Sequence, residues 1–169
     1  MQRLISLSLL LVLLVTGCSG KQESPSLSPE ERSELYEDAI EAARDAQTND
    51  TMPLITEADD DLAQMTFELL GVSASDMNAY ALSVSLMNVR AYAVAAIYPA
   101  AGKEDAVLEG LNTFVDSQKQ SFEHYLADQY EIALNARLET LEDGTVLLVM
   151  SENQDPLFDA IRDTILQGT

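Results

Sequence analysis

The chain has 169 residues, of which 29 are acidic and nine are basic, so its formal net charge is −20 at neutral pH. This balance argues against nucleic-acid binding, because phosphates would be repelled and no basic cluster is present to neutralise them. It argues equally against electrostatic docking of the domain on an anionic bilayer. Metal ions, cationic ligands and basic partners are compatible with the charge, but a well-solvated surface explains it more simply.

Residues 1–17 have the three parts of a bacterial export signal. Arg3 supplies a basic start, Leu4–Val15 is an almost unbroken apolar run, and two small residues then precede Cys18. The run is too short to span a hydrocarbon core, which needs about 20 residues, but it suits a signal peptide. We therefore exclude residues 1–17 from reasoning about the fold.

The four residues Val15-Thr16-Gly17-Cys18 resemble the lipobox that bacterial lipoprotein-modifying enzymes recognise. The Cys18 thiol would take a diacylglyceryl group through a thioether, and its small neighbours would let a signal peptidase cleave before it. Two acyl chains on one residue give stable anchoring. We expect a protein anchored to the cell membrane by lipid and facing the extracytoplasmic side. The alternatives are an ordinary secretory signal with a chance cysteine, or a buried apolar helix.

The rest of the chain divides into a tether and one domain. Residues 18–28 are polar and contain Ser, Gly and Pro, which predicts a flexible tether behind the lipidated cysteine. Residues 29–169 are enough for a single domain with its own core. Since Cys18 is the single cysteine, no disulfide is available to that domain.

Two helices are predicted first. Ser28 is a suitable cap, Pro29 suits the first helical position and Glu31 completes a capping box, so a helix begins here and ends near Gln47. Its apolar stripe comprises Tyr36, Ala39, Ile40 and Ala43. After a short extended piece, a second helix is predicted over 56–70. Thr56 would cap this helix and Gly71 would end it. The apolar residues that share one of its faces are Leu62, Met65, Leu69 and Leu70.

A change of period then predicts two strands. Apolar residues alternate with small ones from Tyr80 to Leu86, which is typical of a half-buried strand. Asn88 is a plausible turn before a second strand over 90–98. The alanines of this second segment leave a helix over 89–97 as an alternative.

A long helix is predicted over 103–126, with Gly110 as a mild defect of about 1 kcal/mol relative to Ala. Asp143-Gly144 separates the strand-like runs 132–142 and 145–151, which favours a hairpin because such a turn needs positive φ. The second run is continuously apolar and is expected to be a central strand. A last helix is predicted from Asp155-Pro156.

The predicted order is one or two helices followed by β-β-α-β-β-α. Hairpins imply antiparallel pairing. We therefore predict an α+β fold with a four-stranded antiparallel sheet and helices packed on one face, which would bury the apolar surfaces of both.

Behind the lipobox, the tether and an acidic first helix, the stretch Asp116–Glu152 resembles a family of small lipoproteins of Firmicutes, catalogued as the domain of unknown function 4358. The resemblance extends over about 62–165, and its features are Gln118, Phe122, Tyr125, Asp128-Gln129, an alanine-bearing strand and Gly144 before an apolar strand. It implies a lipoprotein with a single α+β domain. It brings no activity, cofactor or catalytic residue.

Catalytic and metal-binding patterns are weak in this sequence. His124 is the single histidine, no nucleophile elbow accompanies it, and we expect a surface helix residue. The acids Asp59, Asp60 and Asp61, or Asp50 with Glu57, are the metal candidates, but they lack the spacing and glycine of a calcium loop. We expect a charge cluster at a helix N-terminus there.

Aromatic residues are expected in the core at Phe114 and Phe122, whereas Tyr125 and Tyr130, near a helix-to-strand corner, are candidates for a functional surface. We assign Cys18 as a lipidation site and assign no catalytic, cofactor-binding or metal-ligating residue.

The leading interpretation is a non-enzymatic, lipid-anchored module that binds an envelope protein or a small ligand, with no nucleic-acid partner. The alternatives are a carboxylate-based envelope hydrolase and an acidic cation-binding lipoprotein.

Overall fold

The computed structural model describes residues 27–169 and confirms the α+β class. The strands β1 (Met77–Val84), β2 (Ala93–Pro99), β3 (Arg137–Thr140) and β4 (Val146–Met150) form one antiparallel sheet in the order β1-β2-β4-β3. The continuously apolar run after Gly144 is therefore an interior strand, as the sequence predicts. The segment before residue 99 is also a strand, which rules out the alternative helix.

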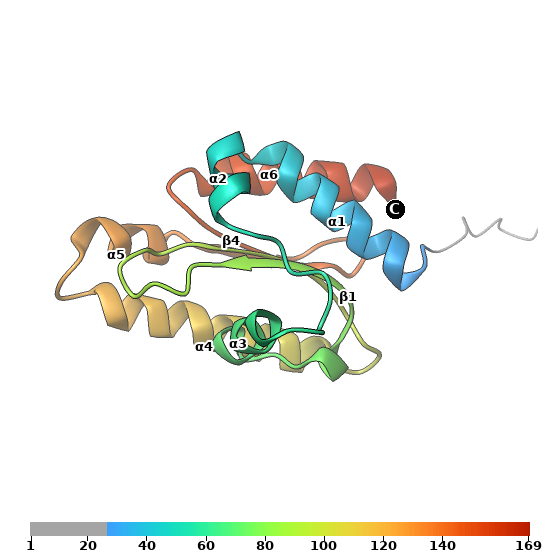
Figure 1. Ribbon diagram of the computed structural model, residues 1–169, viewed down its shortest axis with the longest axis horizontal. Helices are drawn as coiled ribbons and strands as arrows, with labels where there is room; N and C mark the ends of the chain where they lie inside the picture. The colour runs from blue at the N-terminus through green and yellow to red at the C-terminus, as the bar shows by residue number, and fades with distance from the viewer. Residues whose placement is uncertain (1–26) are drawn as a thin grey trace, which may run out of the picture.

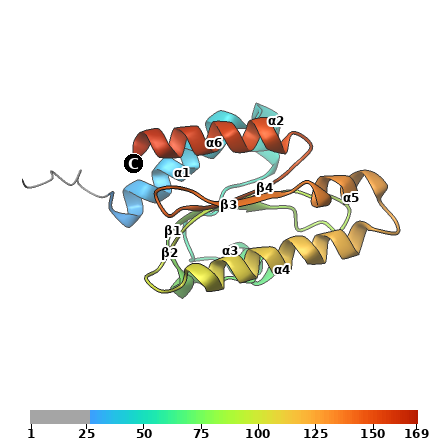
Figure 2. The same ribbon diagram turned by 180° about the vertical axis from the view of Figure 1, so that it is seen from behind.

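Helices cover both faces of this sheet (Figure 1, Figure 2). On one face lie α1 (Pro29–Ala43), α2 (Ala46–Thr51) and α6 (Gln154–Gly168). On the other face lie α3 (Asp61–Leu70) and α4 (Glu104–Phe122). The expectation that helices pack on one face was wrong, and the domain has three layers.

The composition of the strands explains the second covered face. Along β2, Ala93, Ala95 and Ile97 belong to the core beneath α3 and α4, while Val94 and Ala96 belong to the core beneath α1 and α6. The small residues of β1 that suggest an exposed face, including Ala81 and Ser83, are fully buried. Small side chains here do not mark solvent, because they let α1 lie close to the sheet.

Several element boundaries differ from the predicted ones. The first helix ends at Ala43, and a short α2 follows it. The α3 helix begins at Asp61 with Asp60 as its cap, in place of Thr56. The run 132–142 is not one strand, because α5 (Ala127–Leu134) precedes a β3 of four residues.

The predicted caps and turn are confirmed at three places. Ser28 and Glu31 form the capping box of α1. Gly71 ends α3 in the left-handed conformation with φ of 69°, and Gly144 has φ of 91° in the β3–β4 turn.

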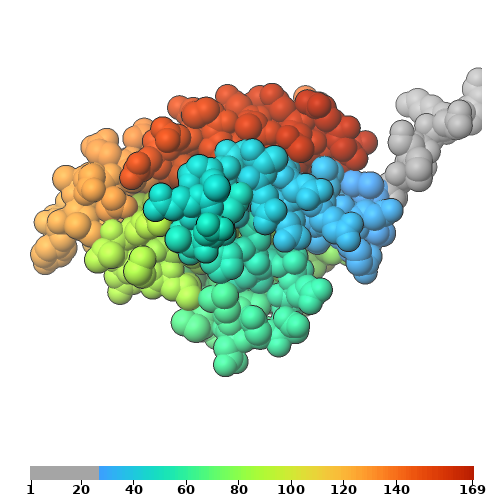
Figure 3. All heavy atoms as spheres, turned by 45° about the horizontal axis from the view of Figure 1, so that its top comes forward, coloured from blue at the N-terminus to red at the C-terminus, as the bar shows by residue number. Residues whose placement is uncertain are grey.

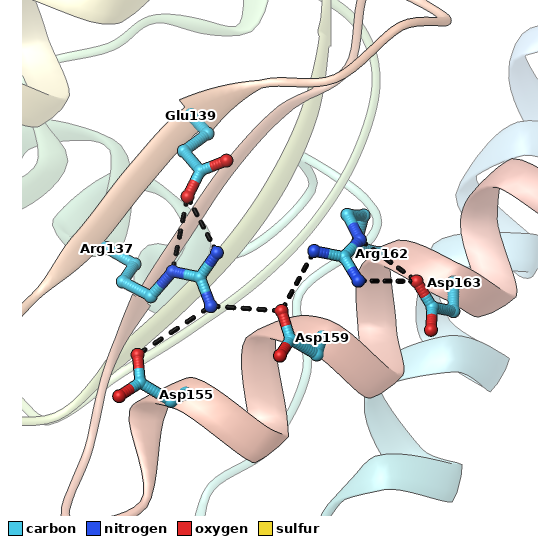
Figure 4. Close-up of polar contacts among 6 residues, drawn as sticks. All are labelled: Arg137, Glu139, Asp155, Asp159, Arg162 and Asp163. Atoms are coloured by element: carbon cyan, nitrogen blue, oxygen red, sulfur yellow. Dashed lines mark hydrogen bonds and ion pairs between the residues drawn. The ribbon is translucent and has the colours of Figure 1, made fainter.

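The edge strand β3 is fixed to α6 by an ion-pair network (Figure 4). The Arg137 guanidinium donates to Glu139 at 2.7 Å and to Asp159 at 3.0 Å, and it lies 3.8 Å from the centroid of the Phe158 ring. Asp159 also accepts from Arg162 at 2.9 Å. A short, charged edge of this kind resists pairing with another chain.

The two ends of the sheet differ in what they carry. At the end that we call the loop end lie the β1–β2 loop (85–92), the β4–α6 connection (151–153) and α5. At the opposite end, which we call the α1 end, α1 begins beside the β3–β4 turn, where Arg32 pairs with Asp143. The first described residue, Leu27, therefore lies at the end of the domain opposite the loop end (Figure 1).

Candidate functional site

The loop end contains a cavity of about 700 Å³. Its walls come from the α1–α2 junction, α2, the β1–β2 loop, α5, the β4–α6 connection and the start of α6. Figure 3 shows α2 in cyan, the β1–β2 loop in yellow-green and α5 in orange beside one another, away from the blue start of α1. A cavity of this volume is within the range of small-molecule sites.

Arg44 forms part of the cavity wall and is nine-tenths buried. It follows the last residue of α1, so the helix delivers its guanidinium to the loop end. Its Nη1 donates to the carbonyl of Met52 at 3.1 Å and to the hydroxyls of Ser83 and Tyr92, each at 3.2 Å, and its Nε donates to Asn49 at 2.8 Å. All four acceptors are uncharged.

Arg90 lines the same cavity from the β1–β2 loop and lies 5.3 Å from the centroid of the Tyr92 ring. The loop is held in place by two hydrogen bonds. The amide of Ser85 donates to the carbonyl of Tyr92 at 3.0 Å, and the amide of Ala91 donates to Oε1 of Gln129 on α5 at 2.8 Å.

These two arginines differ from every other lysine and arginine in residues 27–169. The other five each have a carboxylate within 4.0 Å, and they are Arg32, Lys103, Lys119, Arg137 and Arg162. The chain has 29 acidic residues. Even so, two described arginines, Arg44 and Arg90, have no carboxylate partner, and both line the same cavity.

The β4–α6 connection adds a polar side chain to the cavity wall. Ser151 is nine-tenths buried and lines the cavity, and its Oγ has no hydrogen-bond partner among the described residues. Asn153 precedes α6 and makes no side-chain cap hydrogen bond to it. The positive end of the α6 dipole is therefore uncapped beside an unsatisfied buried hydroxyl.

Three apolar residues of the β1–β2 loop border the cavity, and we call them the apolar lip. Leu86, Met87 and Val89 on the β1–β2 loop are 41%, 59% and 62% exposed, although they are apolar. Met87 also lines a neighbouring groove of about 420 Å³, together with Met65 and Leu69 of α3. Neighbouring exposed apolar residues bordered by polar ones are typical of interaction sites.

The predicted face of α3 was wrong in part. The buried residues of this helix are Ala63, Thr66, Phe67 and Leu70, whereas Met65 and Leu69 face outward. This orientation places Met65 and Leu69, two residues of the predicted apolar face, on the groove beside the apolar lip.

His124 lies outside both cavities, in the turn that follows α4. Its nearest carboxylate is that of its neighbour Glu123, at 3.7 Å, and its side chain is 73% exposed. His124 is on the surface, as expected, but it lies in a turn, because α4 ends at Phe122 and not near residue 126 as predicted.

The acidic candidates for metal binding have capping and surface positions. Asp60 accepts a hydrogen bond from the amide of Ala63 at 2.7 Å, so it is the N-cap of α3. Among residues 27–169, no group of three or more His, Cys, Asp or Glu side chains is placed to hold a metal ion.

The aromatic residues singled out in the sequence differ in burial. Phe114 and Phe122 are buried in the core, as predicted. Tyr130 is partly buried against that core, and Tyr125 is 87% exposed. Neither tyrosine lines the cavity. The two residues that the sequence offered as a functional surface are therefore near the cavity but do not form its wall.

Burial raises the pKa of Glu37, and the neighbouring carboxylates of Glu41, Asp38 and Glu34 raise it further. This carboxyl group is on α1 and lines neither cavity. Asp45 does line the main cavity, but hydrogen bonds from the amide and hydroxyl of Thr48 lower its pKa, so it is held as a carboxylate.

The proposed lipidation site, Cys18, lies outside the described residues. Within residues 27–169, every helix is too short or too polar to cross a membrane.

Comparison with known proteins gives one match. Residues 55–151 match the family described as Domain of unknown function (DUF4358), whereas no curated protein and no solved structure matches the chain. The matched region runs from the bridge between Ile55 and Leu82 to Ser151, and so includes the whole sheet with the β1–β2 loop and α5. The match starts slightly before the resemblance in the sequence and ends before α6. The chain therefore belongs to the family described as Domain of unknown function (DUF4358).

Proposed function

We propose that this protein is a non-enzymatic binding module of the cell envelope, anchored to the membrane through a lipid on Cys18, and that its loop end is the recognition surface. The observation that carries the proposal is the loop-end cavity with its two arginines that have no carboxylate partner and its apolar lip. These are the features of a binding surface.

The position of the cavity supports the anchored arrangement. The domain begins at the α1 end, and the cavity is at the opposite end of the sheet. A chain held to the bilayer before residue 27 would leave the cavity free to meet a ligand. The anchor would also raise the local concentration of the module near membrane partners without any new contact.

Family membership and the lipobox together support a Firmicutes-type bacterial lipoprotein. The acidic charge supports a partner or ligand other than nucleic acid. We do not propose the hydrolase, because Asp45 in the cavity is engaged as the cap of α2 and Glu37, whose pKa is raised, lies elsewhere. The cation-binding alternative has no supporting cluster among the described residues.

The anchor is tested by fractionation of cells that express the wild-type chain or Cys18→Ser. We expect the wild type in the membrane fraction after a high-salt wash, carrying a thioether lipid. Membrane retention of Cys18→Ser as a processed chain without lipid would refute this part of the proposal.

The recognition surface is tested by photo-crosslinking in intact cells. A photoreactive residue at Val89, on the apolar lip, is compared with one at Ala101, an exposed position on the opposite end. We expect a specific adduct from position 89 that position 101 does not give. The same adducts from both positions, or none from position 89, would contradict a recognition role for the loop end.

A further inference from the structure

We propose that the loop-end cavity binds an organic anion, in which a carboxylate or phosphate-ester head meets the two arginines and an apolar body contacts the lip. This inference rests on the proposed function of the loop end as a binding surface, and it assigns the chemical class of the ligand.

The cavity contains a positive charge that no carboxylate of the described residues matches. Arg44 is nine-tenths buried, and its four acceptors are all neutral. A buried cation is unfavourable unless a negative charge compensates it. The described residues accept hydrogen bonds from its Nε and Nη1, and none accepts from Nη2. An anion in the cavity would supply both the charge and the acceptor.

The chain has 29 acidic residues, yet no described carboxylate forms an ion pair with Arg44 or Arg90. Asp45 follows Arg44 directly and lines the same cavity, but it accepts from Thr48. Glu152 also lines the cavity and is exposed, with no ion pair to either arginine. A guanidinium presents its donors in a planar fork that matches carboxylate and phosphate oxygens.

The Ser151 hydroxyl is buried in the cavity wall without a partner, which is rare for a buried polar atom. The uncapped start of α6 follows it directly, and helix N-termini favour anions. Ser151, the start of α6 and the two arginines thus line one cavity.

The apolar side chains of the cavity wall indicate that the ligand has an apolar body. Met87, Val89, Ile132 and Leu157 line the cavity beside the arginines. A bare inorganic anion would leave these side chains exposed to water, whereas an anion with an apolar body would cover them.

The test is calorimetric titration of the full lipidated chain in phosphatidylcholine nanodiscs, with empty nanodiscs subtracted. The probes are hexanoate, hexyl phosphate, hexanol, hexylamine and inorganic phosphate. We expect hexanoate or hexyl phosphate to bind at least about tenfold more tightly than hexanol, hexylamine and inorganic phosphate, because charge-assisted hydrogen bonds are the strong ones. The stronger of the two anions identifies the head group.

Two matched pairs of variants accompany the titration. Arg90→Gln is expected to weaken anion binding about tenfold. Arg162→Gln, which removes a half-buried arginine paired with Asp159 outside the cavity, should leave it unchanged. Ser151→Ala should weaken binding while maintaining or raising the thermal midpoint, because it deletes an unsatisfied buried hydroxyl. Thr66→Val deletes another such hydroxyl outside the cavities and should leave binding unchanged.

Binding of hexanol as tight as that of the anions, with no effect of Arg90→Gln, would overturn the anion inference and leave the loop end as a binding surface. Inorganic phosphate binding as tightly as hexyl phosphate would overturn the apolar body. If no probe binds, the inference fails, and the crosslinking at Val89 decides separately whether the proposed function stands.

Discussion

Gly110 occupies the point where α4 touches the end of α3. A β-carbon added there would be 2.3 Å from the carbonyl oxygen of Gly71 and 2.9 Å from its carbonyl carbon. Backbone atoms cannot yield as a flexible side chain can. The glycine that helix propensity alone marks as a mild defect is therefore required by the close approach of two helices.

The first prediction follows from this contact. Gly110→Ala should lower the free energy of unfolding by at least about 2 kcal/mol, although helix propensity alone predicts a gain of about 1 kcal/mol. Asn112→Ala, at an exposed position of the same helix, should change stability little. Urea unfolding measures both, and a stabilised Gly110→Ala variant would show that α3 and α4 are not packed this closely.

Asp76 provides a pH-dependent prediction. Hydrogen bonds from Lys103, at 2.8 Å, and from Ser73 lower the pKa of this carboxyl group. Because its folded pKa lies below the unfolded value of about 3.9, the carboxylate stabilises the fold above that value. This contribution is lost as the pH falls through the folded pKa.

Asp76→Asn should therefore be less stable than the wild type at pH 7, and the difference should shrink as the pH falls from about 5 to 2. Urea unfolding at several pH values measures the difference. Asp116→Asn, which alters an exposed pair with Lys119, is the control and should change stability little at any pH. A difference for Asp76→Asn that stays constant with pH would contradict the role of its charge.

Some of the site was visible in the sequence and was missed. Between Asp76 and Glu104 the chain contains no acidic residue, and Arg90 and Lys103 are its charged residues. An acid-free stretch in so acidic a chain indicates that Arg90 has no local partner. Arg44 gave no such signal, because Glu41 stands one helical turn before it. Its isolation from carboxylates arises from the way α1 ends against Ser83 and Tyr92.

At the scale of elements, the capped helices and the Asp143-Gly144 turn were predictable because local chemistry determines them. The buried face of α3 was not. Its sequence has apolar residues on two stripes, and the contact of Gly71 with Gly110 selects the stripe with Ala63 and Phe67. Likewise, the strand-like pattern in 132–142 did not reveal α5, which ends at Leu134 and buries Ala133 in the core.

A variant in β3 tests how the edge of the sheet is held against α6. Arg137→Leu should lower stability by about 1 kcal/mol, because it removes both the ion pairs to α6 and the cation–π contact with Phe158. Since salt screens the ion pairs, the difference should shrink but persist in about 1 M NaCl. Arg162→Gln removes half-buried ion pairs but no cation–π contact, and it should have a smaller effect. Equal effects of the two variants would contradict a special role for Arg137.

At the scale of the whole molecule, the covering of both sheet faces is the property that sequence patterns missed. The small residues of β1 resemble a solvent-facing side, but Ala79 and Ala81, together with Ala96 of β2, provide the room in which α1 and α6 lie. This second layer also creates the site. The end of α1 carries Arg44 and the start of α6 follows Ser151, so both reach the cavity because their helices cover the same face.

The arrangement places the start of the domain at one end and the cavity at the other, which has a functional meaning only if the chain is anchored through Cys18. Intact-mass analysis of the mature protein, purified from the membrane fraction of its own host, measures this directly. We expect a chain that begins at Cys18 and carries a diacylglyceryl group on its sulfur. A retained leader, or a mature chain with a free thiol at Cys18, would contradict it.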